Sequence, residues 1–393
     1  MTPQARVQAA IELLDEIIVA ARDGGAAGDT LISRYFQARR YAGSKDRRAV
    51  REIVYDAIRR CGDRPASGRA AVLGLAEDQP ELKALFDGSA HGPAPIDEGE
   101  GGAVASLVPR WIANRMAKLV DQHEQIALLT RAPLDMRINR LKTDMAAMQG
   151  AFPDAAPVPG FPDALRLPEG FALEKSPEWE AGLVEVQDAG SQMIASACEA
   201  HPGMTVIDLC AGAGGKTLNL AADMAGKGRI IAADTSRQRL FRLPDRAARA
   251  GAENVEIMLL NPGREAEAMA SLDGLADVVL IDAPCSGSGT WRRNPEARWR
   301  LTPERLQRLV AEQGRILDLA VPLVKPGGRL VYAVCALTDA EGHDQVDAFL
   351  RRHTGWQIAP VDAAPGRIWG AGRLLTPAHD GTDGFFMAAM VKD

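Results

Sequence analysis

One aspartate and two cysteines stand where covalent chemistry would need them. Residues 278–281 form a short apolar run rich in β-branched side chains, which predicts a strand buried on both faces. The run ends at Asp282, and Cys285 follows within a stretch of Ser and Gly. A second predicted strand, over 329–334, ends at Cys335. Because parallel strands bring their carboxyl ends to one edge of a sheet, where ligands bind in open α/β folds, we expect these three groups to converge there.

A glycine-rich loop after the strand predicted at 206–209 indicates a cofactor rather than a plain tight turn. A P-loop needs glycine where Cys210 stands, and a dinucleotide fingerprint needs glycine where Thr217 stands. S-adenosylmethionine carries no phosphate, so its loop only has to let the backbone approach the methionine part. Asp234, about 20 residues after the loop, is placed to hydrogen-bond both ribose hydroxyls. We therefore expect S-adenosylmethionine, bound by Cys210, Ala211, Gly212, Ala213, Gly214, Gly215, Lys216, Asp234, Asn261 and Asp282.

These residue types suit methylation of carbon 5 of a pyrimidine. That carbon is not nucleophilic, so a thiolate must first add to carbon 6, which is covalent catalysis. A base must then remove the carbon-5 proton so that the thiolate can leave. A thiolate at neutral pH needs a nearby cation or polar loop, and Lys216 is expected at the same edge, while Asp282 can hydrogen-bond the N3/N4 edge of the base. The residues alone do not rank Cys285 against Cys335 as the nucleophile.

The elements that position these groups form a regular alternation from about residue 186 onward. Helices of ten residues or more separate apolar strands, which predicts a doubly wound parallel sheet of the Rossmann-like, class I methyltransferase type. The predicted strands are 206–209, 229–233, 255–259, 278–281, 329–334 and 384–391, and the predicted helices include 236–250 and 303–321.

The remainder of the chain divides by composition. A helical stretch is expected around 107–129 and a strand at 134–139. A segment rich in Gly, Pro and acidic residues separates these from the helical start and predicts a linker. The expected domains are a helical one over 1–90, a linker over 91–104, a small α/β module over 105–182 and a catalytic domain over 183–393.

The overall composition is that of a globular protein of the reducing cytosol. Charged residues make up 25% and hydrophobic ones 46% of the 393 residues. The five cysteines are scattered and show no CxxC spacing, so neither a disulfide framework nor zinc is indicated. No apolar run is long enough to span a bilayer, and the start lacks a signal-peptide pattern. We expect a cytoplasmic monomer with no metal and no membrane partner.

Positive charge gathers locally although the formal net charge is -6. Most charge runs are ordinary solvated helix faces, but the segment 39–51 is densely basic within an acidic chain, which strengthens the alternative of a surface facing a polyanion. Basic residues also stand beside Trp291 and Trp299, an arrangement suited to phosphate contacts and base stacking, or to a structural aromatic cluster with surface arginines. The candidate RNA-binding residues are Arg47, Arg48, Arg51, Arg292, Arg293 and Arg298.

The motifs resemble those of the RsmB/Sun-type RNA cytosine-C5 methyltransferases of the RsmB/NOP family. The resemblance implies that Cys335 is the nucleophile and that Cys285 helps to release the product. It also implies a NusB-like RNA-binding helical domain at the N-terminus, and small-subunit (16S) ribosomal RNA as the substrate. The resembling segments, which run through most of the chain, are 46–55, 137–142, 186–192, 208–217, 234–240, 282–290, 293–299, 332–335 and 383–386.

The chain departs from the family pattern at a few positions. The cofactor loop has Gly212 and Ala213 where the family has Ala and Pro, Val334 replaces a Thr, and Ala336 replaces a Ser. Asn261 stands near the place of an acid that faces adenine, and an amide can still hydrogen-bond there. Two alternatives stay open: a transfer-RNA or DNA cytosine methyltransferase, and a catalytically weak RNA-binding assembly factor. The intact pair of cysteines argues against the second.

Overall fold

The computed structural model describes residues 1–361 and 365–393, which form two compact units. The sequence places residues 105–130 in the small module and 290–305 in the catalytic domain, but both ranges belong to the helical unit. The helical unit comprises 1–130 and 290–305, and the catalytic unit comprises 131–289 and 306–393.

Helices expected near the N-terminus build the helical unit. In α1 (Pro3–Asp23) the Thr2 hydroxyl caps the first turn and a left-handed Gly24 ends the last one. Apolar residues recur at helical spacing along this helix, at Val7, Ile11, Leu14 and Ile18, and they are buried in the core of the unit. The other helices are α2 (Gly28–Ala38), α3 (Ser44–Arg60), α4 (Gly68–Asp78), η1 (Pro80–Leu85), η2 (Ala113–Arg115), α5 (Gln122–Ala127) and α13 (Ala297–Arg300).

The helix expected over 107–129 is wrong for most of its length. Only η2 and α5 form there, and Val108, Ile112 and Met116 are buried from turns and coil instead. The helix-like spacing of these three apolar residues comes from their burial against the helical core and not from a helix. Pro109 also lacks the backbone N–H that a continuous helix would use. The predicted linker is coil, as expected, and Arg69 fixes it by bonding Glu100 and two carbonyl oxygens, those of Ala94 and Pro95.

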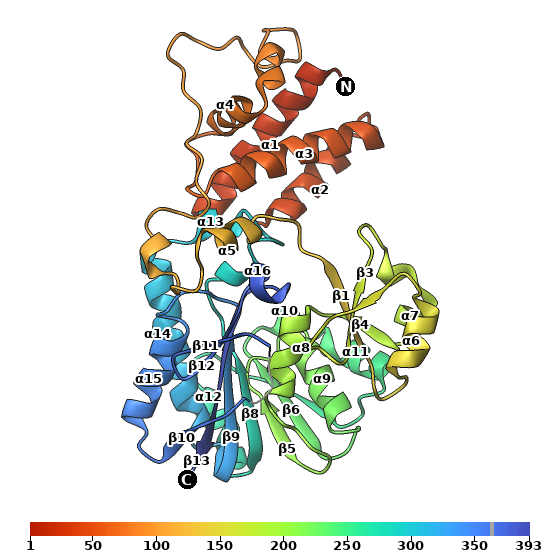
Figure 1. The fold of residues 1–393 in the computed structure, drawn as a ribbon, viewed down its shortest axis with the longest axis vertical. Helices are drawn as coiled ribbons and strands as arrows, with labels where there is room; N and C mark the ends of the chain where they lie inside the picture. The colour runs from red at the N-terminus through yellow and green to blue at the C-terminus, as the bar shows by residue number, and fades with distance from the viewer. Residues whose placement is uncertain (362–364) are drawn as a thin grey trace. The chain divides into compact units, whose positions relative to one another are not determined.

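A small antiparallel sheet opens the catalytic unit (Figure 1). It lies within residues 131–186 and includes the strand predicted at 134–139. The strands pair in the order β2-β3-β1-β4. They are β1 (Leu134–Ile138), β2 (Ala156–Pro157), β3 (Ala164–Leu167) and β4 (Val184–Val186), accompanied by α6 (Met145–Ala151), η3 (Leu173–Lys175) and α7 (Pro177–Glu180).

The large sheet confirms the predicted doubly wound α/β architecture. Within the described residues it has nine strands in the order β11-β12-β13-β9-β8-β5-β6-β7, with β10 paired to β13. Strands β5 to β9 are mutually parallel, and β13 runs antiparallel to β9. The strands are β5 (Thr205–Asp208), β6 (Arg229–Asp234), β7 (Val255–Leu259), β8 (Ala276–Asp282), β9 (Val324–Val334), β10 (Trp356–Ala359), β11 (Arg367–Trp369), β12 (Gly372–Leu375) and β13 (Phe385–Lys392).

Helices cover both faces of this sheet (Figure 1). Val278 and Leu280 of β8 pack into one core with α8, α9 and α11, whereas α12, α14 and α15 lie on the other side. The helix predicted at 236–250 is broken in two near Arg242, with Pro244 in the first turn of the second helix, where proline is tolerated. The helices are α8 (Ala189–Ser196), α9 (Gly215–Asp223), α10 (Arg237–Leu240), α11 (Leu243–Ala250), α12 (Glu265–Met269), η4 (Ala270–Leu272), η5 (Ser288–Thr290), α14 (Pro303–Ala320), α15 (His343–Arg352) and α16 (Pro377–Asp380).

Neither a membrane-spanning helix nor a metal cluster occurs among the described residues. None of the helices in 1–361 and 365–393 is long and apolar enough to cross a membrane. In the same ranges no cluster of three or more His, Cys, Asp or Glu side chains could hold a metal ion.

Candidate active site

The glycine loop joins the end of β5 to the start of α9. Gly212 and Gly214 have φ angles of 56° and 85°, a region that strongly favours glycine. A Cβ on Gly214 would come within 2.1 Å of the Leu243 side chain, so this position admits no larger residue without displacement. A Cβ on Gly212 or Gly215 would meet nothing closer than 3.7 Å, so the loop faces open space beside these two residues.

Asp234 ends β6 and is fixed against the glycine loop. Its Oδ2 accepts a hydrogen bond from the backbone N–H of Gly212 at 2.8 Å, and its Oδ1 accepts one from Ser236 at 2.6 Å. Arg239 also donates to Oδ1, at 3.3 Å. The side chain is almost fully buried. The acid predicted from its distance along the chain is therefore beside the loop, with an orientation set by backbone amides.

Asp208 is a buried acid that the sequence reasoning did not select. It is the last residue of β5, and its Oδ2 accepts a hydrogen bond from the Thr217 hydroxyl at 2.7 Å. Its Oδ1 is buried without a partner among the described residues. Burial raises the pKa of the Asp208 carboxyl to about 7. The signal available in the sequence was an acid directly after the apolar residues Val206 and Ile207.

Lys216 and Asp282 form an ion pair beside the same loop. The Lys216 Nζ lies 2.7 Å from the Asp282 Oδ2. Burial lowers the pKa of Lys216, but the charge of Asp282 and the hydrogen bond raise it by more, so its pKa lies above the usual value. Lys216 is thus a permanent cation at neutral pH, and the sequence prediction that these two residues converge is confirmed.

Cys285 and Cys335 meet at the same edge of the sheet. Strands β8 and β9 pair in parallel with Asp282 opposite Ala333, so both thiols follow just beyond the paired residues. The two Sγ atoms lie 3.2 Å apart. The hydrogen bond to the Cys335 sulfur and burial raise the pKa of the Cys285 thiol well above its usual value. Both thiols are partly exposed, so a substrate atom has access to them.

The chain's relatives are methyltransferases. Residues 195–391 match the family described as 16S rRNA methyltransferase RsmB/F. The probable ribosomal RNA small subunit methyltransferase B of Synechocystis sp. is 35% identical over 272 residues, which cover 66% of this chain and 60% of that protein. The ribosomal RNA small subunit methyltransferase B of Erwinia tasmaniensis is 30% identical over 335 residues, covering 81% of this chain and 75% of that protein.

The chain belongs to the RsmB/F methyltransferase family. The resemblance drawn from the motifs is thereby confirmed. Among solved structures, a methyltransferase homologue from Pyrococcus horikoshii is 26% identical with a TM-score of 0.64 and covers 72% of this chain and 95% of its own. The crystal structure of PH0851 covers the whole of both chains with a TM-score of 0.76 at 22% identity, a likeness in fold.

S-adenosylmethionine is the cofactor of this RsmB/F methyltransferase, and the site fits it. The open space beside Gly212 and Gly215 would admit the methionine part, and the buried Asp234 carboxylate has acceptor capacity for the ribose hydroxyls. Burial raises the pKa of the Cys210 thiol well above its usual value, so Cys210 lines the loop as a neutral group. Asn261 follows β7 with an exposed side chain, and its contact with adenine stays a prediction.

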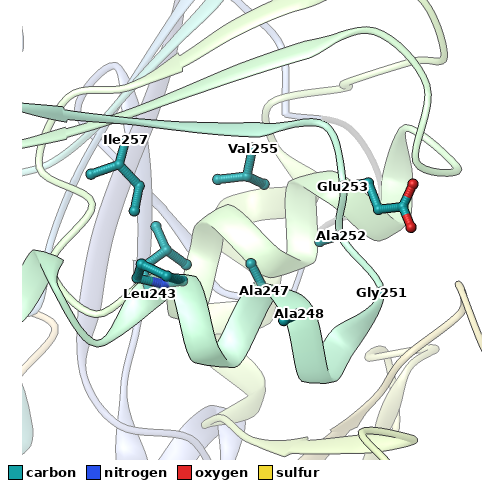
Figure 2. A pocket seen from close by; sticks show the side chains of 9 residues that line it. Leu243, Ala247, Ala248, Gly251, Ala252, Glu253, Val255 and Ile257 are labelled. Atoms are coloured by element: carbon teal, nitrogen blue, oxygen red, sulfur yellow. The ribbon is translucent and has the colours of Figure 1, made fainter.

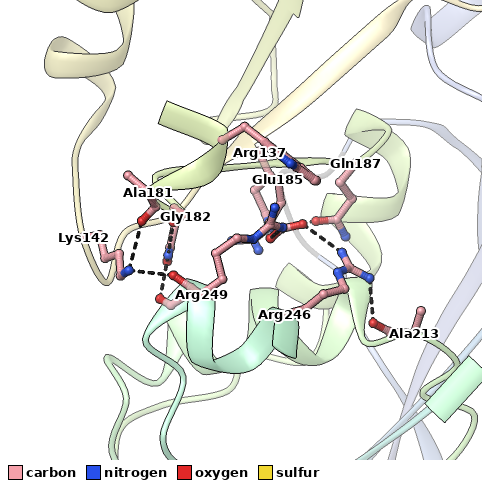
Figure 3. Close-up of polar contacts among 12 residues, drawn as sticks. Arg137, Lys142, Ala181, Gly182, Glu185, Gln187, Ala213, Arg246 and Arg249 are labelled. Atoms are coloured by element: carbon pink, nitrogen blue, oxygen red, sulfur yellow. Dashed lines mark hydrogen bonds and ion pairs between the residues drawn. The ribbon is translucent and has the colours of Figure 1, made fainter. Parts of the chain in front are cut away.

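Polar contacts tie the small sheet to the cofactor loop (Figure 3). Arg246 of α11 donates to the carbonyl oxygen of Ala213 at 2.6 Å and to Glu185 of β4 at 2.9 Å. Arg249 also pairs with Glu185, and Lys142 donates to the carbonyl oxygens of Ala181 and Arg249. The module that precedes the catalytic sheet therefore supports the backbone of the loop through one arginine, which the sequence reasoning did not identify.

A groove of about 530 Å³ lies beside α11 and the edge strand β7 (Figure 2). Leu243, Ala247, Val255 and Ile257 are among its lining residues. Leu243 packs against Gly214 from this side, but the thiols and the Lys216–Asp282 pair do not line the groove. It is thus separate from the candidate active site.

The candidate RNA-binding residues of the helical unit have different environments. Arg47 donates to the carbonyl oxygen of Ala42 and stacks near Phe36, so part of its role is structural. Arg48 and Arg51 are exposed on α3, and Arg48 pairs with Glu52. These positions leave the predicted RNA contacts of α3 as a proposal for Arg48 and Arg51 above all.

The expectation for residues 291–300 needs correction. Arg298 is buried, and its guanidinium donates to the carbonyl oxygens of Pro295, Leu107, Ile58 and Arg59. Burial lowers the pKa of Arg298 to about 10. Trp291, Trp299 and Arg292 are buried as well, whereas Arg293 is exposed. Arg298 and the two tryptophans are therefore structural, and of this group Arg293 remains a candidate for RNA.

Proposed function

We propose that the protein transfers a methyl group to carbon 5 of a cytosine in small-subunit ribosomal RNA. The observation that carries the proposal is the 3.2 Å approach of two thiols beside the Lys216–Asp282 pair, at the edge of the sheet that holds the glycine loop. Oxygen or nitrogen methylation needs no thiol, whereas carbon 5 of a pyrimidine needs a thiolate that first adds to carbon 6, and the second thiol can serve as the base that ends the reaction. Relatives named ribosomal RNA small subunit methyltransferase B support the substrate class.

We assign the attack on carbon 6 to Cys335. Lys216 is a fixed cation, and its raised pKa includes an electrostatic contribution from Cys335, so a positive charge lies near the sulfur that would attack. Asp282 accepts a hydrogen bond from the exocyclic amine of the cytosine and orients the ring. When bound, S-adenosylmethionine supplies an electrophilic methyl group. The target base has to be unstacked to reach these groups.

Cys285 acts second in this scheme. While the Cys335 sulfur accepts its hydrogen bond, Cys285 keeps its proton, because that bond is the first cause of its raised pKa. Once the Cys335 sulfur is bonded to carbon 6, this stabilisation of the Cys285 thiol is lost. Cys285 can then release its proton to solvent. Once carbon 5 carries its new methyl group, the Cys285 thiolate takes the proton from carbon 5, the electrons of that C–H bond re-form the 5,6 double bond, and the Cys335 sulfur leaves as a thiolate. One thiol thus begins the reaction and its neighbour ends it.

The test is transfer of a labelled methyl group to RNA from a strain that lacks the gene. Ribosomal RNA, isolated small subunits and transfer RNA are offered separately, and bisulfite sequencing locates the product. Label in a single cytosine of small-subunit RNA, absent with Cys335→Ala protein, is the expected result. Label confined to transfer RNA overturns the substrate, label at a base other than cytosine overturns the chemistry, and no label in any RNA overturns the enzyme proposal.

A further inference from the structure

A buried glutamate joins the two loops that carry the thiols. Glu341 lies in the segment between β9 and α15, six residues after Cys335, and its side chain is fully buried. Its Oε1 accepts a hydrogen bond from the backbone N–H of Ser286 at 2.7 Å, and Ser286 is the neighbour of Cys285. Its Oε2 accepts one from the Thr338 hydroxyl at 2.8 Å, within its own loop. One carboxylate therefore spans both loops.

Gln313 extends the connection to the long helix α14. Its Nε2 lies 3.1 Å from the Glu341 Oε1 and 3.0 Å from the carbonyl oxygen of Pro284, which precedes Cys285. The backbone on both sides of Cys285 is thus held, at Pro284 by Gln313 and at Ser286 by Glu341. The Tyr332 hydroxyl of β9 in turn donates to the Glu341 carbonyl oxygen at 2.8 Å.

Ionic pairing does not explain why an acid is buried here. In the described part of the chain no Lys, Arg or His pairs with Glu341, and its partners are an amide N–H, a carboxamide and a hydroxyl. Burying a carboxylate is unfavourable unless hydrogen bonds replace its hydration. Charge-assisted bonds are shorter and about twice as strong as neutral ones. If the side chain only had to fill space between the loops, an uncharged residue would serve better than an acid. A carboxylate is suited to holding the two loops in a fixed position, because its hydrogen bonds are stronger.

We propose that Glu341 is a positioning residue that sets the separation of the Cys285 and Cys335 sulfur atoms by tying one loop to the other. This inference deepens the proposed function and, for its catalytic part, rests on it. The thiol separation itself does not rest on that function, because it can be measured without any RNA or cofactor. Two independent readouts can therefore be obtained from one set of variants.

The charge of Glu341 makes the test unambiguous. That charge is among the causes that raise the pKa of Cys285. Removing it favours the Cys285 thiolate, which by itself speeds thiol oxidation. A variant that loses the charge and yet oxidises more slowly must have lost the position of the thiols.

The first readout is disulfide formation between Cys285 and Cys335 in the full-length protein. With oxidised dithiothreitol as the oxidant, the two thiols lose two protons and two electrons, and the reagent is reduced to its dithiol. The linked peptides are quantified by mass spectrometry over time. We expect Glu341→Ala to slow linkage about tenfold or more, because a disulfide forms only over a narrow range of Cα separations.

Glu341→Gln is the matched rescue. Its carbonyl can accept from Ser286 and Gln313, and its amide can donate to the Thr338 hydroxyl, which can rotate to accept. We expect the Glu341→Gln variant to form the Cys285–Cys335 disulfide at least as fast as the wild type.

Glu312→Ala is the control for the loss of an acid that leaves the Glu341 hydrogen bonds in place. It removes an exposed acid that pairs with Arg315 on α14. Gln313→Ala, which removes the second contact, should give an intermediate rate.

The second readout is methyl transfer. We expect Glu341→Ala to lower kcat by about 10²-fold with little change in the KM for the cofactor, because a misplacement of about 1 Å at reacting groups has this effect. Linkage as fast in Glu341→Ala as in the wild type overturns the proposal, as does failure of Glu341→Gln to restore a rate lost in Glu341→Ala. Should the wild type methylate no RNA, the proposed function fails, but the linkage rates still decide the role of Glu341.

Discussion

The sulfur atoms of Cys285 and Cys335 lie 3.2 Å apart at the ends of the adjacent parallel strands β8 and β9. This approach lets one thiol serve the other, and it predicts different failures for their variants. Cys335→Ala should form no covalent RNA complex, because it lacks the sulfur that adds to carbon 6. Cys285→Ala should accumulate one, because no base removes the carbon-5 proton, and its turnover should fall by about 10²- to 10⁴-fold.

The measurement for the two thiols is a denaturing gel of protein incubated with substrate RNA and cofactor. A slow-migrating RNA–protein band in Cys285→Ala and none in Cys335→Ala is the expected pattern. The double variant is the control and should show neither band nor turnover. The reverse pattern would exchange the two roles.

Gly214 and Gly215 are neighbours with opposite tolerances. Gly214 has a φ of 85°, and a methyl group added to it would lie 2.1 Å from Leu243, whereas a methyl group on Gly215 meets open space at the start of α9. Gly214→Ala should lower the free energy of unfolding by about 1–3 kcal/mol and weaken cofactor binding. Gly215→Ala should leave stability unchanged or raise it by up to about 1 kcal/mol. Urea unfolding and calorimetric titration check both, and equal losses would contradict the strain argument.

The parallel core and the convergence of site residues were predictable from the sequence for one physical reason. Buried apolar runs form the inner part of four parallel strands, and a polar residue after such a run has to lie at the edge. The runs are 206–207 in β5, 230–233 in β6, 278–281 in β8 and 330–334 in β9. Asp234, Asp282 and Cys335 follow this rule. Asp208 also follows this rule. It was not selected from the sequence because it directly precedes the glycine loop and could be taken for one of the loop residues.

Other features depend on partners that lie far away in the sequence. The guanidinium of Arg298 is buried and donates to carbonyl oxygens of Ile58 and Leu107. Both partners lie far away in the sequence, so no local sequence pattern predicts this arrangement. An arginine beside a tryptophan looks the same in the sequence whether it faces RNA or a domain core. The tie from Glu341 to Ser286 likewise spans 55 residues.

Arg298 and Arg293 should respond differently to truncation. Arg298→Ala leaves buried carbonyl oxygens without donors, each costing roughly 1–3 kcal/mol, so we expect a loss of about 3–5 kcal/mol in the helical unit. Arg293→Ala changes an exposed side chain and should alter stability by less than about 0.5 kcal/mol. Hydrogen exchange of amides near the end of α3 reports the first effect.

The same pair of variants tests where RNA binds. Filter binding at several salt concentrations should show weaker RNA affinity for Arg293→Ala. The slope of the logarithm of the binding constant against the logarithm of the salt concentration should become less steep by about one, as expected for the loss of one phosphate contact. An unchanged affinity would remove Arg293 from the RNA surface. Normal exchange near α3 in Arg298→Ala would contradict the structural role of that guanidinium.

Asp208 should make stability depend on pH. Burial raises the pKa of its carboxyl to about 7, while in the unfolded chain it titrates near its usual value of 3.8. Between these values the folded protein holds a proton that the unfolded protein has released. Stability therefore falls as pH rises from about 4 to about 7 and is level above that range. At low pH, where Asp208 is protonated in both states, the contribution vanishes.

Asp208→Asn isolates this contribution, because the amide does not titrate and its carbonyl can still accept the hydrogen bond from Thr217. Relative to the wild type, the variant should gain stability as the pH rises from about 4 to about 7, by at most about 4 kcal/mol, and the difference should stay level above that range. Urea unfolding without cofactor at several pH values measures the difference. Asp223, whose pKa burial raises to about 6, titrates in both proteins and therefore cancels from that difference.

A stability difference between the two proteins that stays constant with pH would mean that Asp208 is ionised in the folded protein throughout the range. Its unpartnered oxygen would then have to be hydrated or bound to a cation.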